Sequence, residues 1–162
     1  IMKSSIQRNL MGILLFAGLF FMINQKTYAH CEIPCGIYGD SLRIALIKEH
    51  ITTIEKSMNK INELSAESTP DYNQLVRWTM NKEEHAKKIQ DIVSQYFLHQ
   101  RLKITDPSDK EAYAKYQKEL ELLHHLLVYA MKSKQTTDLE YIASMNGTVD
   151  EFAKSYFHTH EH

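Results

Sequence analysis

Hydrophobic residues recur at helical spacing along most of the chain beyond residue 39. From Asp40 onwards the apolar positions alternate in steps of three and four, the spacing of one face of an α-helix. Asp40 stands where an N-capping residue would start this helix, and no Gly or Pro follows it before Pro70. The pattern predicts one long amphipathic helix with a continuous apolar stripe: Ile44, Ile47, Ile51, Ile54, Met58 and Ile61.

A second amphipathic segment is predicted from about Asp71 towards Leu98. Its apolar pattern is weaker in the middle, around Lys82 and His85. The residues expected to point inward are Leu75, Trp78, Ile89, Ile92, Val93 and Tyr96.

Two further helices follow a break at Pro107. Ser108 with Glu111 forms a capping box, and Thr137 with Glu140 repeats this pattern. Short connections between four such helices predict an all-α fold, an up-down four-helix bundle. We find no strand pattern, internal repeat or second domain. The two expected stripes are Tyr113, Tyr116, Leu120, Leu123, Leu127 and Ala130, then Leu139, Ile142, Met145, Val149, Phe152 and Tyr156.

The first 29 residues have the pattern of a secretory signal peptide. Lys3 and Arg8 provide a basic start, Leu10 to Ile23 is almost entirely apolar, and Thr27-Tyr28-Ala29 suits a signal peptidase. The apolar stretch is short for a transmembrane helix, which needs about 20 residues. Removal of residues 1–29 would leave one domain, 30–162, that is exported to the periplasm or the medium and has no stable membrane association.

Charge excludes one class of partner. The leader carries three basic residues and no acidic one, so its removal would change the formal net charge from −1 to −4. A nucleic-acid-binding protein would need a clustered basic surface, which this composition does not suggest. The polar, His-containing tail, residues 158–162, is interpreted as a frayed end rather than as a metal site.

Potential metal ligands gather in residues 30–38, which read His-Cys-Glu-Ile-Pro-Cys-Gly-Ile-Tyr. We refer to this segment as the hook. Cleavage after Ala29 would free the α-amine of His30 beside its imidazole, and Cys31 and Cys35 add two thiols. Amine, amide and two thiolates can surround a metal in a plane with the imidazole axial, an arrangement that favours nickel or copper over tetrahedral zinc. The alternative is a disulfide, the usual state of two cysteines in an exported protein.

The hook resembles the nickel-binding N-terminus of the nickel-containing superoxide dismutases, with His30, Cys31, Pro34, Cys35, Gly36 and Tyr38 matching in type and spacing. Arg77, the segment 81–86 and Tyr96-Phe97 are similar to that family's second helix. The resemblance implies an antioxidant oxidoreductase that converts superoxide into dioxygen and hydrogen peroxide. It also implies one nickel ion per chain, cycling between the divalent and trivalent states, and a homohexamer.

The same resemblance assigns roles to individual residues. His30, Cys31 and Cys35 are the implied nickel ligands, whereas Tyr38 and Tyr96 would control access to the metal and order water without binding it. Packing is the competing interpretation for Tyr96.

The sequence departs from the family in the second helix. An acid and an arginine that hold the axial imidazole in many members are replaced here by Ala45 and His85. The helix is also about one turn shorter between His85 and Tyr96. Candidate substitutes for orienting the His30 imidazole are His85, His50 and Glu49, and a plain helical position is the competing interpretation for His85.

Three functional classes follow from these features. The leading one is a nickel superoxide dismutase. The alternatives are a non-catalytic periplasmic metal carrier and a disulfide-stapled helical adaptor. An anionic substrate would profit from positive potential, for which the available cations are Lys48, Arg77, Lys82 and Lys87.

Overall fold

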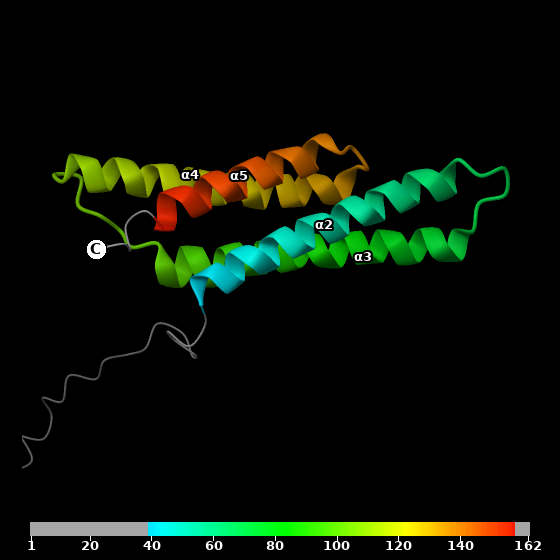
Figure 1. Ribbon diagram of the computed structural model, residues 1–162, viewed down its shortest axis with the longest axis horizontal. Helices are drawn as coiled ribbons and strands as arrows, with labels where there is room; N and C mark the ends of the chain where they lie inside the picture. Colours follow the sequence, from blue (N-terminus) through cyan, green and yellow to red (C-terminus); the bar gives the residue numbers. More distant parts are fainter. Residues whose placement is uncertain (1–38, 158–162) are drawn as a thin grey trace, which may run out of the picture. The chain divides into compact units, whose positions relative to one another are not determined.

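Residues 39–157 are described by a computed structural model, and within them all regular structure is helical (Figure 1). The all-α prediction is therefore confirmed for this part of the chain. The predicted leader, the hook and the tail 158–162 lie outside the described residues. The helices are α2 (Asp40–Ser65), α3 (Tyr72–Asp91) continued by the π-helix η1 (Ile92–Arg101), α4 (Lys110–Gln135) and α5 (Glu140–Phe157).

The four helices enclose one hydrophobic core. Helix α2 packs against α3 and α5, and α4 packs against α3 and α5, so each helix has two neighbours (Figure 1). The centre is built from large side chains with almost no exposed surface, including Ile47, Met58, Phe97, Leu123 and Met145. Among the described residues, no helix is both long and apolar enough to cross a membrane.

The predicted apolar stripe of α2 is buried from Ile44 to Met58, and Ile61 is partly exposed. The predicted stripe of α5 is right except for Leu139, which precedes the helix and is 40% exposed. The stripe of α4 is partly wrong. In α4, Leu123 and Ala130 are buried as expected, but Leu120 is 39% exposed, and Leu122 and Leu126 face the core instead. Leu residues occupy more than one face of this helix, so periodicity alone does not select the buried one. The buried face of α4 is the one that packs against both α3 and α5.

Three helix starts differ from the predicted caps. Gly39, not Asp40, is the N-cap of α2, and Asp109 caps α4 by accepting from the Ala112 amide at 3.1 Å. The Glu140 amide at the start of α5 donates to Asp138 at 2.9 Å, the bond expected for Thr137. Aspartates compete well with Ser and Thr for free helix amides, which explains the shifts at α4 and α5. Asp40 is released for other contacts.

The second predicted helix ends in a π-helix rather than at Leu98. Bonds there join residues five apart, as in the 2.8 Å bond from the Leu102 amide to the Phe97 carbonyl. This register brings Tyr96 and Arg101, also five apart, into contact. The π-helix thus positions two polar groups near the start of α2.

Lys82 explains the weak centre of the second predicted stripe. Its side chain is only 4% exposed, and its Nζ atom donates to the carbonyls of Lys134 at 2.9 Å and Thr136 at 2.8 Å. The last carbonyls of a helix have no partner within the helix. The ammonium group of Lys82, on α3, supplies a donor to these carbonyls and thereby stabilises the C-terminal end of α4.

Candidate functional site

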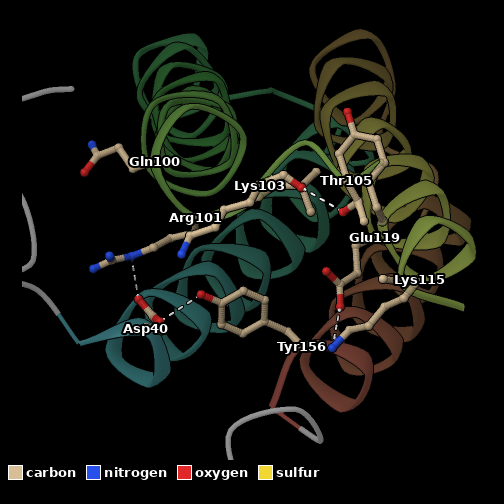
Figure 2. A pocket seen from close by; sticks show the side chains of 11 residues that line it. Asp40, Gln100, Arg101, Lys103, Thr105, Lys115, Glu119 and Tyr156 are labelled. Carbon is tan, nitrogen blue, oxygen red and sulfur yellow. Dashed lines mark hydrogen bonds and ion pairs between the residues drawn. The ribbon is translucent and has the colours of Figure 1, made fainter. Parts of the chain in front are cut away.

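The carboxylate of Asp40 is the centre of a half-buried polar cluster at the first turn of α2. Its Oδ1 atom accepts a hydrogen bond from the Tyr96 hydroxyl and lies 2.9 Å from Nε of Arg101. Its Oδ2 atom accepts a hydrogen bond of 2.9 Å from the Tyr156 hydroxyl. Figure 2 shows Asp40, Arg101 and Tyr156 converging from α2, η1 and α5. We refer to the four residues Asp40, Tyr96, Arg101 and Tyr156 as the Asp40 cluster.

Tyr96 is the most enclosed member of this cluster. Its side chain is buried, and its hydroxyl accepts a 3.0 Å hydrogen bond from Nη2 of Arg101 while donating to Asp40. The guanidinium carbons of Arg43 and Arg101 lie 5.1 and 4.9 Å from the ring centre, within cation–π range. The phenol is therefore held at its ring and at its hydroxyl.

Hydrogen bonding and charge fix the protonation states of the Asp40 cluster. Burial alone would raise the pKa of Asp40, but the bonds from Tyr96 and Tyr156 and the charge of Arg101 outweigh it and lower that pKa. Burial, followed by the hydrogen bond to Asp40, raises the pKa of both Tyr96 and Tyr156. At neutral pH the cluster holds an ionised carboxylate, two protonated phenols and a charged guanidinium.

A cleft of about 400 Å³ opens beside the Asp40 cluster (Figure 2). Inside it, Glu119 is almost fully buried and accepts a 2.9 Å hydrogen bond from Ser155, with Nζ of Lys115 at 3.5 Å. Three cations against two carboxylates give the lining an excess of positive charge, which attracts small anions. The charged lining residues are Asp40, Arg101, Lys103, Lys115 and Glu119.

Of the predicted metal ligands and access residues, only Tyr96 lies in the described part of the chain. Tyr96 is placed in the Asp40 cluster, where it has both a buried ring and a bonded hydroxyl. His30, Cys31, Cys35 and Tyr38 lie outside the described residues, so their assignment as metal ligands and as an access residue stays a prediction.

The structure brings His85 and His50 together across α2 and α3. Their Nδ1 atoms are 3.1 Å apart, and both side chains are half-buried. Burial lowers the pKa of both imidazoles. The neighbouring His85 and Lys88 lower the pKa of His50 further, and Lys88 lowers that of His85 further. His50 follows Asp40 by ten residues, about 15 Å along α2. Whether the pair orients His30 stays a prediction.

The cations expected to attract substrate are mostly engaged elsewhere. Lys48 lies 2.5 Å from a carboxylate oxygen of Asp150, and Lys87 lies 2.7 Å from one of Asp91. Lys82 is not available to attract an anion, because its ammonium group is buried against backbone carbonyls.

Arg101 was not among the predicted site residues, and Tyr156 was expected only in the core. One signal was available: in an antiparallel helix pair the first residue of one helix lies near the last residue of the next. Asp40 begins α2 and Arg101 ends η1, so their opposite charges should meet. Among the described residues no group of three or more His, Cys, Asp or Glu side chains is arranged to hold a metal ion.

Comparison with known proteins returned one finding. A family model described as nickel-containing superoxide dismutase matches residues 25–160, which is most of the chain. Searches of curated proteins and of solved structures each gave no match.

Proposed function

The chain belongs to the nickel-containing superoxide dismutases, and we propose that its nickel ion is held by the hook, through His30, Cys31 and Cys35. The enzyme is an oxidoreductase that disproportionates superoxide into dioxygen and hydrogen peroxide. The observation that carries this conclusion is the family match over residues 25–160, which includes the whole hook.

The chemistry of the hook's donors fits nickel. Cys31 and Cys35 offer two soft thiolates, and His30 offers an imidazole and, once it is the first residue, an amine. Nickel bound to such donors supplies a one-electron couple between its divalent and trivalent states, because charge donated by thiolate sulfur and amide nitrogen stabilises the higher state. Hard oxygen donors would not give this stabilisation.

The Asp40 cluster is close to the hook along the chain, because Asp40 follows the hook almost directly in sequence. Five residue steps separate Cys35 from Asp40, and an extended chain spans at most roughly 17 Å over that length. Asp40 itself is fixed to Tyr96, Arg101 and Tyr156. We infer that this cluster anchors the base of the hook on three helices.

Tyr96 acts in this proposal as a fixed hydroxyl group that serves the reaction together with Tyr38 of the hook. Its raised pKa keeps the proton on the phenol oxygen, where Asp40 accepts the hydrogen bond. A phenol so held orders neighbouring water and shapes access without ionising. Disproportionation of two superoxide ions consumes two protons, so ordered proton donors near the site serve the reaction.

Positive charge in the cleft supports a path for superoxide. Arg101, Lys103 and Lys115 outnumber the carboxylates of the lining. An excess of one sign of charge in a cleft raises the local concentration of the opposite ion and its association rate.

Maturation, export and assembly complete the proposal. A signal peptidase would remove residues 1–29 and create the His30 amine outside the cytoplasm. Assembly into a homohexamer is supported by apolar side chains exposed at four-residue intervals on α3: Tyr72 at 73%, Val76 at 58% and Met80 at 66%.

The test of the hook compares two purified forms, one beginning at His30 and one retaining Ala29. In the longer form the His30 nitrogen is part of a peptide bond and has no basic lone pair. Only the shorter form should bind nickel with thiolate-to-nickel absorption and show dismutase activity. Equal nickel content and activity in both forms would mean that the amine is not a ligand.

A further inference from the structure

A second set of potential metal ligands, separate from the hook in sequence, lies between α2 and α3. The Nδ1 atoms of His50 and His85 face each other at 3.1 Å. Their rings meet edge to face, with centres 4.9 Å apart and planes inclined by 78°. Both side chains are half-buried and therefore open to ions from solvent on one side.

Two imidazole nitrogens at this distance need a hydrogen-bonded proton or a metal ion between them. If both Nδ1 atoms carry only a lone pair, the two negative ends repel. One proton shared as Nδ1–H···Nδ1 removes the repulsion, and so does one metal ion bound by both lone pairs. The geometry is compatible with either occupant.

The spacing suits a transition metal. With metal–nitrogen bonds of about 2.0–2.1 Å, nitrogens 3.1 Å apart subtend an angle of roughly 100° at the metal. This angle lies between the square-planar and tetrahedral values. We propose that His50 and His85 form a second, weaker metal site for a divalent cation of the Cu²⁺ or Zn²⁺ class, with water completing the coordination.

The surroundings leave the imidazoles available as ligands. Burial lowers the pKa of both, so both are neutral at pH 7. The charged groups acting on the pair are Glu49 from α2 and Glu84 and Lys88 from α3, and Lys88 is bonded to Glu84 at 2.8 Å. When a metal replaces the shared proton, that proton moves to Nε2 of the same ring, so binding near neutral pH releases none.

The protein supplies only two ligands at this site, because the described residues contain no group of three or more His, Cys, Asp or Glu side chains that could hold a metal ion. The site should therefore bind more weakly than the hook. Among divalent ions of the first transition row, Cu²⁺ binds imidazole most tightly, which makes it the probe of choice.

The experiment is a Cu²⁺ titration of the nickel-loaded protein, followed by electron paramagnetic resonance, with released nickel measured in parallel. The parent should bind one Cu²⁺ whose spectrum shows coupling to two nitrogens. His50→Gln and His85→Gln should each lower the affinity for this Cu²⁺ ion about tenfold or more. His125→Gln, a matched loss of one histidine on α4, should leave it unchanged.

Helix circular dichroism of each variant verifies that it is folded. Acidification of the unmodified protein provides a further arm, because a protonated imidazole offers no lone pair to copper and the same copper signal should be lost. Retention of that signal in His50→Gln and His85→Gln would place the copper elsewhere, for example on the tail histidines. A parent that binds no such copper would mean that the pair shares only a proton. Either result overturns the proposal.

Discussion

Replacing Asp40 by asparagine should destabilise the nickel-loaded protein substantially and with a characteristic dependence on pH. Asparagine has the same shape but keeps only one acceptor oxygen, and its NH2 group would face a phenol that donates. One of the hydroxyls of Tyr96 and Tyr156 therefore loses its acceptor, and Arg101 loses its anion.

The size of the effect follows from these contacts. A hydrogen bond to a charged group contributes about 1.5–3 kcal/mol. The Asp40 and Arg101 side chains are 26% and 22% exposed, so their ion pair is partly screened and contributes about 1 kcal/mol. We expect a loss of about 2–4 kcal/mol in the free energy of unfolding near neutral pH.

The sign of the pH dependence is set by the lowered pKa of Asp40. A carboxyl whose pKa is lower in the folded state stabilises the fold above its unfolded pKa, and this stabilisation disappears as pH falls through the folded pKa. The difference between parent and Asp40→Asn should therefore be full at about pH 7 and shrink below about pH 4.

Urea unfolding followed by helix circular dichroism measures this difference, with nickel content determined for each sample because bound metal also stabilises. Asp150→Asn is the matched control. It removes a carboxylate that also joins α2 and α5, but its pair with Lys48 is 47% and 62% exposed, so the expected cost is below about 1 kcal/mol. An Asp40→Asn loss no larger than that of the control, or one unchanged in acid, would refute the role assigned to the cluster.

Three further outcomes are expected. Cys31→Ser or Cys35→Ser should abolish nickel binding and dismutase activity together, because a hydroxyl is a hard and poor replacement for thiolate; full activity in either variant would contradict the hook. Lys103→Glu should lower kcat/KM several-fold at low ionic strength and much less at high salt, and a loss independent of salt would argue against steering. Lys82→Met leaves two carbonyls at the end of α4 without their ammonium donor and should reduce the free energy of unfolding by about 2–3 kcal/mol in the same urea assay; an unchanged value would show that water replaces the lysine.

Some of this molecule could be derived from its sequence because the information is local. The stripe of α2 and most of that of α5 follow from spacing within a single helix, and the all-α fold follows with them. The chemistry of the hook is also local, since the donors of His30, Cys31 and Cys35 lie within six consecutive residues. Donor type and short spacing are enough to suggest nickel and the family to which the chain belongs.

Other features depend on which helices meet and in what register. Asp40 contacts Tyr96 and Tyr156 across 56 and 116 residues, and His50 meets His85 across 35. No periodicity joins positions so far apart. The buried face of α4, the engagement of Lys82 and the five-residue register of η1 likewise arise from packing between helices, where apolar contact and unpaired backbone groups choose among faces that the sequence leaves equivalent. The sequence thus specified the helices and indicated the family, and tertiary packing determined which polar groups meet between the helices.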